Sequence, residues 1–165
     1  MRTCGREKGV GLLEVLLAVV LMSIGFLASA RMQIEGMTAS QSAYSASQAK
    51  LMVQDMTERM RANRVALSNN QYDGLETSNS TTDPGCFTSG NPCSPSQRVV
   101  ADLHSWSQFL HPENENATPL LPSTDTIEAI GTIDFVDGSY KVSVTWADRD
   151  SNGSFERSYS VRVMP

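Results

Sequence analysis

The stretch KGVGLLEVLLAVVLMSIGF, residues 8–26, is the part of the sequence that decides the fold. It begins an apolar run from Val10 to Ala30 in which Glu14 is the only ionisable side chain. About 20 consecutive apolar residues are enough to cross a lipid bilayer as a helix. A carboxylate in such a segment costs roughly 2.5–3.5 kcal/mol on insertion scales, so it is normally kept for a function. The run therefore predicts a membrane-spanning helix with a functional acid near its start.

The residues that flank this run predict its orientation. Arg2, Arg6 and Lys8 precede it, and Glu7 is the only acid among them. Basic residues beside a membrane helix stay in the cytoplasm, so the chain after Arg31 is expected on the other side. The run is longer than the apolar core of a secretory signal, and the sequence after it continues without proline. We expect a single-pass inner-membrane protein with its C-terminal part in the periplasm.

The overall charge argues against nucleic acid as a partner. The 165 residues include 13 Lys and Arg against 18 Asp and Glu, which gives a net charge of −5. An acidic chain repels phosphate backbones. Arg59, Arg61 and Arg64 do cluster, but Asp55 and Glu58 lie among them and no aromatic platform accompanies them. This cluster is better explained as a solvated or subunit-facing helix end.

Two cysteines in the exported part indicate an oxidising compartment. Cys86 and Cys93 are separated by FTSGNP, whereas Cys4 lies in the basic leader. A short loop between two exported cysteines favours a disulfide bond. A metal site is the rival interpretation, although no histidine or further cysteine stands nearby in the sequence.

The pattern of apolar residues predicts one long helix from Val10 to about Leu67. Residues 10–30 form its apolar half and residues 31–67 its amphipathic half. Met52, Met56 and Met60 recur every four residues and so share one stripe of the helix. Such a stripe could form a pliable groove for a partner, but packing against the domain's own sheet is the favoured interpretation.

The remaining residues, 68–165, are expected to form a globular head. Residues 68–97 are rich in Ser, Asn, Gly, Pro and Thr and predict a loop. Ser94 and Pro95 are suited to the start of a helix that runs to Leu110. Alternating patterns predict antiparallel strands near 130–136, 139–147 and 155–163.

The strand pattern completes an α+β prediction. Asp137-Gly138 is a strong signal for a two-residue hairpin. Arg157 falls among the inward-facing residues of the last strand, so it needs a partner or lies at an edge. A sheet with one apolar face needs a cover, which the amphipathic half of the long helix can supply.

Other candidate sites are weak. The stretch from Asp148 to Gly153 begins like a calcium loop, but Tyr159 stands where an EF-hand needs glutamate, so a polar turn is favoured. His104 and His111 have no clear third ligand and are expected at the surface or as helix caps. No nucleophile elbow, phosphate loop or dinucleotide glycine pattern occurs. We therefore expect no enzyme, no cofactor and no metal.

The leader and the apolar run together resemble the type IV pilin superfamily. The likeness is carried by Lys8-Gly9 followed by VGLLEVLLAVVLMSIG. It implies that prepilin peptidase cuts after Gly9, that Val10 becomes an N-methylated terminus, and that Glu14 is the fifth mature residue, which docks subunits. The implied fold is a long N-terminal helix, membrane-spanning in its first half, packed on a small antiparallel sheet.

Three further stretches are similar to minor pilins of the PilV type. They are DMTERMRANR, the helix that contains Trp106, and the strand GSYKVSVTW. This resemblance implies a subunit that primes or caps pilus assembly at the cell surface, near the tip. The implied partners are prepilin peptidase, other minor pilins, the major pilin, a tip adhesin of the PilY type and, before assembly, the lipid bilayer.

Three alternatives stay open at this point. A minor pseudopilin of a type II secretion system would share the leader, the helix and the processing. A pilus-displayed adhesion module would use the loop of residues 68–97 as its contact surface. A simple membrane-anchored periplasmic domain would have no use for Glu14.

Overall fold

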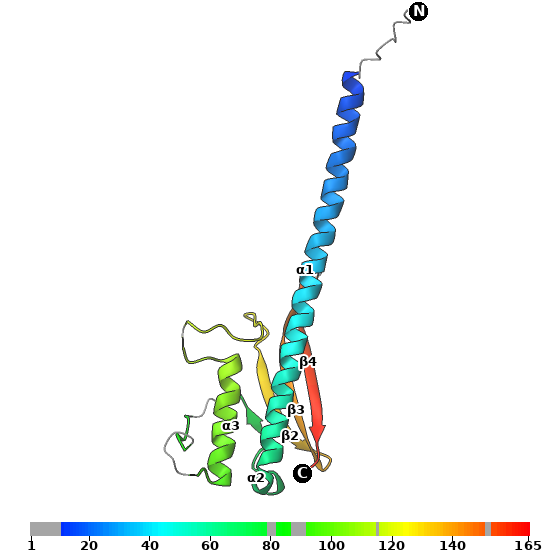
Figure 1. The fold of residues 1–165 in the computed structure, drawn as a ribbon. Coiled ribbons are helices and arrows are strands. Elements are labelled where there is room, and N and C mark those ends of the chain that lie inside the picture. The colour runs from blue at the N-terminus through cyan, green and yellow to red at the C-terminus, as the bar shows by residue number, and fades with distance from the viewer. Residues whose placement is uncertain (1–10, 79–81, 87–91, 115, 151–152) are drawn as a thin grey trace, which may run out of the picture. The chain divides into compact units, whose positions relative to one another are not determined.

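The structure is a computed structural model that describes residues 11–78, 82–86, 92–114, 116–150 and 153–165 (Figure 1). Its elements in chain order are α1 (Leu12–Ala62), α2 (Arg64–Ser68), β1 (Leu75–Glu76), α3 (Pro95–Leu110), β2 (Ile130–Val136), β3 (Ser139–Asp150) and β4 (Gly153–Val163). The chain divides into two compact units, Met1–Ala39 and Ser40–Pro165, and α1 contributes residues to both.

The first unit contains the N-terminal part of α1. Its described side chains are exposed, apart from the half-buried Thr38. Ser23, Ser29 and Thr38 each donate their hydroxyl to the backbone carbonyl four residues earlier, at 2.7, 3.0 and 3.0 Å respectively. Serine and threonine satisfy their hydroxyls in this way inside a helix. The hydroxyls of these three residues therefore have acceptors within the helix itself.

The second unit is built around a four-stranded antiparallel sheet in the order β1-β2-β3-β4. The hairpin predicted at Asp137-Gly138 is confirmed, since both residues have positive φ, 53° and 75°, and Val136 pairs with Ser139. The pairing of β3 with β4 continues to Asp150 and Gly153, so this hairpin is tighter than the predicted strand ends at 147 and 155. The α+β prediction is confirmed.

The core lies between this sheet and the helices, with α1 and α3 on the same face (Figure 1). Met52, Met56 and Met60 are buried in it, so the methionine stripe packs within the head as predicted. Trp106 of α3 donates its indole N–H to the backbone carbonyl of Met52 at 3.2 Å. Its ring also lies so close to Gly131 of β2 that a Cβ there would be 2.5 Å from it. Glycine at 131 is thus what lets α3 approach the sheet.

The long helix differs from the prediction at its C-terminal end. α1 stops at Ala62, and the short α2 begins at Arg64. Asn63 between them has φ −112° and ψ 60°, outside the helical range, and its side chain is buried. The Asn63 amide donates to the Pro95 carbonyl at 2.8 Å, and this tertiary contact accompanies the break in the helix.

One strand lies where only loop was predicted. β1 consists of Leu75 and Glu76, which pair with Ile133 and Thr132 of β2. Thr77 directly after it is buried, and its hydroxyl accepts from the Gly131 N–H at 2.9 Å. The segment 68–97 is therefore partly incorporated in the sheet.

Candidate functional site

Glu14 lies in the first turn of α1. Its backbone N–H donates to the Gly11 carbonyl at 2.9 Å, which begins the helix. Its side chain is exposed and, within the described residues, has no ion-pair partner. The N-terminus of a helix carries a partial positive charge that favours an acid there. The carboxylate is thus available to a cation outside the described part of the chain.

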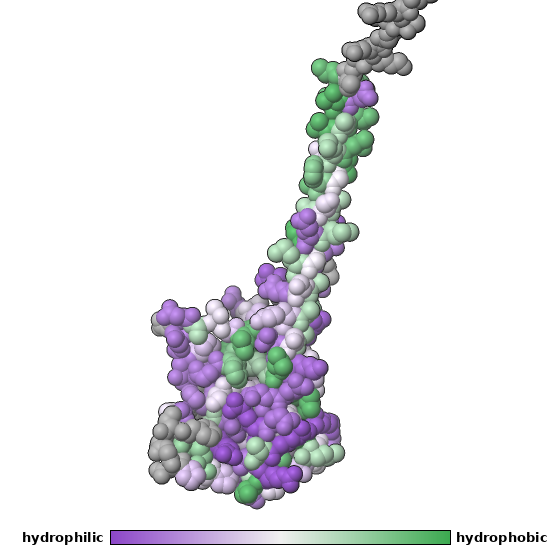
Figure 2. Space-filling model, in the orientation of Figure 1, coloured by the Kyte–Doolittle hydropathy of each residue, from purple (hydrophilic) through white to green (hydrophobic). Residues whose placement is uncertain are grey.

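The surface around Glu14 is apolar on every side. Figure 2 shows hydrophobic residues gathered along the first part of α1 on the face in view. A contiguous apolar surface of this kind is seldom exposed to water and marks a membrane or protein contact. α1 is also long and apolar enough to cross a membrane. The exposed large apolar residues of this segment are Leu12, Leu13, Val15, Leu16, Leu17, Val19, Val20, Leu21, Met22, Ile24, Phe26, Leu27, Met32, Ile34 and Met37.

Gly9 and Val10, the predicted cleavage site and new terminus, lie outside the described residues. Of the processing motif, the structure therefore shows only Glu14 and the helix that follows it.

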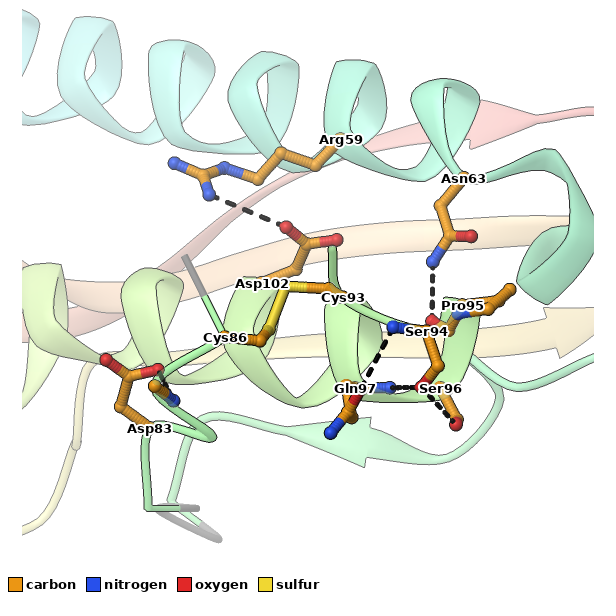
Figure 3. The surroundings of a disulfide bond; sticks show 11 residues. Arg59, Asn63, Asp83, Cys86, Cys93, Ser94, Pro95, Ser96, Gln97 and Asp102 are labelled. Carbon is orange, nitrogen blue, oxygen red and sulfur yellow. Dashed lines mark hydrogen bonds and ion pairs between the residues drawn. A yellow bond between two sulfur atoms is a disulfide. The ribbon is translucent and has the colours of Figure 1, made fainter. Parts of the chain in front are cut away.

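The disulfide predicted between Cys86 and Cys93 is present, with the two Cα atoms 5.2 Å apart (Figure 3). Cys93 directly precedes Ser94, the N-cap of α3. Ser94 and Gln97 form a reciprocal capping box, with hydrogen bonds of 2.9 and 3.2 Å. The disulfide therefore ties the loop to the capped start of α3.

A buried polar network next to this disulfide was not foreseen from the sequence. Tyr72 donates its hydroxyl to Asp102 Oδ2 at 2.8 Å and accepts from the Asn63 amide at 3.2 Å. Arg59 bonds Asp55 at 2.7 Å and lies 3.6 Å from Asp102 Oδ1 (Figure 3). The network links α1, the turn before β1 and α3. Its members come from three separate parts of the sequence, residues 55–63, Tyr72 and Asp102, so no local pattern indicates it.

Burial perturbs the titration of two members of this network. Desolvation raises the pKa of Asp102, although the Tyr72 hydrogen bond and the charge of Arg59 act in the opposite direction. Desolvation also raises the pKa of Tyr72, helped by its hydrogen bond to Asp102 and the charge of that carboxylate. The tyrosine stays protonated and holds the carboxyl in place, so the role of this hydrogen bond is structural.

The structure pairs the remaining predicted candidates with separate partners and does not bring them together in one site. His111 is the C-cap of α3 and lies 3.6 Å from Glu128, whereas His104 lies 4.0 Å from Glu113. Asp148 is engaged by Arg157 at 2.8 Å. Among the residues that the structure describes, no group of three His, Cys, Asp or Glu side chains could hold a metal ion.

The arginine cluster at the end of α1 is largely neutralised by acids of the same chain. Besides the contacts of Arg59, Arg61 bonds Glu58 at 2.7 Å. These pairs agree with the interpretation of a solvated helix end.

Comparison with known families bears on the part of the chain that follows the apolar run. Residues 31–104 match the Tt1218-like family, whose description is type IV pilin Tt1218. The match covers α1 from Arg31, then α2, β1 and the first part of α3, which is less than half of the chain. It supports the resemblance to type IV pilins, which are structural proteins. No curated protein and no solved structure matches the chain.

Proposed function

We propose that this protein is a minor pilin of the PilV type, a structural subunit that helps to prime or cap assembly of a type IV pilus. The observation that carries the proposal is α1 itself. Its N-terminal part exposes apolar side chains with Glu14 as the single acid up to Ala30, and its C-terminal part packs in an α+β head. The match of residues 31–104 to a type IV pilin family supports the pilin part of this proposal.

Maturation would create a cation for Glu14, which has no ion-pair partner among the described residues. Prepilin peptidase would cleave after Gly9, and the new terminus at Val10 would carry a methylated ammonium. Glu14 of one subunit would pair with that ammonium on a neighbour. A carboxylate left unpaired in an apolar medium is costly, and a paired one sets the axial register between subunits. Glu14 is therefore a docking residue in this proposal.

The geometry of such a contact favours a filament. Glu14 and the terminal amine are different groups, so the contact joins unlike patches on successive subunits. Interfaces of this kind do not close on themselves and generate helical assemblies. The exposed apolar side chains of α1 would face lipid before assembly and neighbouring helices afterwards.

The proposed location follows from the same features. The precursor would span the inner membrane once, with its head in the periplasm, and would then enter the pilus near its tip. Its partners would be prepilin peptidase, other minor pilins, the major pilin and a tip adhesin of the PilY type. Cys86 and Cys93 would have a structural role only. No cofactor, metal or nucleic acid is assigned to the subunit.

The test is the N-terminal peptide of the protein, determined by mass spectrometry on sheared surface filaments and on membranes. The expected result is an N-methylated peptide that begins at Val10 in the filament fraction. The same peptide confined to the membrane fraction would contradict a pilus subunit and favour a pseudopilin of a type II secretion system. An intact Met1 in both fractions would overturn the pilin proposal.

A second experiment separates assembly from adhesion. Shortening the loop between Cys86 and Cys93 should leave filament number unchanged, because the proposed docking surface lies on α1. If the variant retains filaments but loses attachment to surfaces, the protein serves as a displayed adhesion module.

A further inference from the structure

Three polar side chains join α1 to the last hairpin of the sheet. Ser42 donates its hydroxyl to Asp148 Oδ2 at 2.6 Å, and Arg157 Nη1 lies 2.8 Å from the same oxygen. Arg157 also donates to the Ser42 hydroxyl at 2.8 Å, which closes a triangle. The other Asp148 oxygen accepts from the Arg149 N–H at 2.8 Å. We call Ser42, Asp148 and Arg157 the clasp.

The clasp buries its acid but leaves its base accessible. The Asp148 side chain is 7% exposed and the Arg157 side chain 43% exposed. The Arg157 guanidinium also lies 5.7 Å from the centre of the Phe155 ring. Charge-assisted hydrogen bonds are stronger than neutral ones. Ser42 and Arg157 therefore both supply hydrogen bonds that offset the cost of burying the Asp148 carboxylate.

Apolar packing near the clasp is thin. Between Ser42 and Met52 the buried or partly buried side chains of α1 are the polar Gln48 and the small ones of Ser45, Ala46 and Ala49. Met52 is the first large buried residue of the helix. Stabilisation by apolar burial scales with the area removed from water, so these small residues contribute little. Among the described residues, the clasp supplies the side-chain hydrogen bonds that join this stretch of α1 to the sheet.

We propose that the clasp sets the point at which α1 docks onto the sheet, and that opening it releases the helix as far as Met52. The segment so released, residues 42–51, would amount to about three helical turns. Loss of either partner leaves the buried Asp148 carboxylate with one compensating side chain fewer, which is costly. Undocking these turns lets water reach the carboxylate while the methionine-lined core stays intact. The clasp is thus a conformational device that fixes how much of α1 belongs to the head, independently of the proposed function.

Hydrogen–deuterium exchange on the full chain in detergent micelles tests this proposal. Arg157→Gln and Asp148→Asn should each raise exchange about tenfold or more across residues 42–51. Exchange in residues 52–60 and 140–146 should change by less than about twofold, because opening is local. The undocked turns lose their packing against the sheet and are held by helix hydrogen bonds alone, so their amides lose protection.

Matched variants distinguish the effect of opening the clasp from the effect of removing any charge or hydroxyl from the same elements. Ser47→Ala removes an exposed serine of the same helix, and Arg162→Gln removes an arginine of the same strand. Both should leave exchange in residues 42–51 unchanged. Ser42→Ala should raise it, and Ser42→Thr, which keeps the hydroxyl, should restore it. The double variant Asp148→Asn with Arg157→Gln should exceed neither single variant by more than about twofold, since the three groups act together.

Two results would overturn the proposal. Unchanged exchange in residues 42–51 of the Arg157 and Asp148 variants would show that the small residues hold the helix without the clasp. A rise spread evenly over residues 42–60 and the strands would show that the clasp is part of one cooperative core.

Discussion

Glu14 and Asp102 are carboxyl groups in contrasting surroundings. Glu14 is exposed at the start of an apolar helix with no described cation beside it, whereas Asp102 is buried and held by Tyr72 and Arg59. The first lacks a partner that the proposed assembly would supply. The second already has its partners within the head. Substitution should therefore affect assembly in one case and folding in the other.

Glu14→Gln should reduce the amount of protein in sheared filaments at least about tenfold, because breaking a buried ion pair costs about 3–5 kcal/mol. The level in membranes should stay unchanged, since the exposed carboxylate forms no ion pair with the residues that the structure describes. Quantitative immunoblots of both fractions measure the effect.

Glu35→Gln is the matched control for Glu14. Glu35 is another exposed acid of α1, and it bonds Arg31 of its own helix at 3.1 Å. Exposed pairs of this kind contribute little, so incorporation should be close to normal. Equal incorporation of the two variants would refute the docking role of Glu14.

Asp102 should make the free energy of unfolding depend on pH in a direction opposite to that of an ordinary salt-bridged acid. Burial raises its folded-state pKa above the usual 3.8, so the folded protein binds its proton more tightly than the unfolded chain does. This contribution is fully present below the unfolded pKa and is lost as pH rises through the raised folded pKa. The facing groups are Tyr72, Arg59 of α1 and Arg98 of α3.

Asp102→Asn should remove this dependence. Urea unfolding across a pH series should show the wild type losing stability relative to the variant as pH rises from below 3.8 through the raised folded pKa. Asp134→Asn, at an exposed acid of β2, should show no such trend. A difference between wild type and Asp102→Asn that is constant with pH would contradict the assignment.

At the scale of elements, the disulfide and the capping box act on the same end of α3. Cys93 and the N-cap Ser94 are adjacent, so the covalent link and the cap both fix the start of the helix. The cap does not depend on the disulfide, because its two hydrogen bonds run between Ser94 and Gln97. We therefore expect α3 to persist without the covalent link.

Replacing Cys86 and Cys93 together by serine should lower the free energy of unfolding by about 2–3 kcal/mol, the chain-entropy estimate for a loop this short. Urea unfolding of the full chain in detergent measures the loss. A reducing agent should destabilise the wild type by a similar amount and leave the double variant unaffected. If the reducing agent destabilised both proteins equally, its effect would not come from this bond.

Elements that are held by their own periodicity could be predicted from the sequence. Apolar residues spaced three to four apart predict the methionine stripe and α3, which Ser94 caps. Apolar residues at every second position predict the strands β2 to β4. The break at Asn63 could not, because its partner Pro95 is 32 positions away. β1 has only two residues and depends on pairing with β2.

The candidate site divides in the same way. Glu14 stands out in the sequence because one acid interrupts an apolar run. Of the clasp, the sequence indicated only Arg157, because this charged residue falls among inward-facing positions of its strand. Nothing in the sequence marks Ser42. Ser42 and its partner Asp148 lie 106 positions apart in the chain, so only the tertiary fold identifies the contact.

At the scale of the whole molecule, the two units bury side chains to very different extents. The described residues of the first unit have almost no buried side chains, whereas the second contains the hydrophobic core, the sheet, the disulfide and the buried polar network. Stability measurements on the full chain will therefore report on the second unit. Incorporation into filaments will report on the first.

The back-bonded hydroxyls of Ser23 and Ser29 have a consequence for the proposed transfer of the subunit from bilayer to filament. Each already has its acceptor inside the helix, so neither has to exchange a hydrogen-bond partner when lipid tails are replaced by protein. Between Leu12 and Ala30, Glu14 is then the one side chain whose free energy differs strongly between the two environments. The charge of this one carboxylate would then decide the direction of transfer. The free energies of the other side chains in the segment would differ little between lipid and the filament.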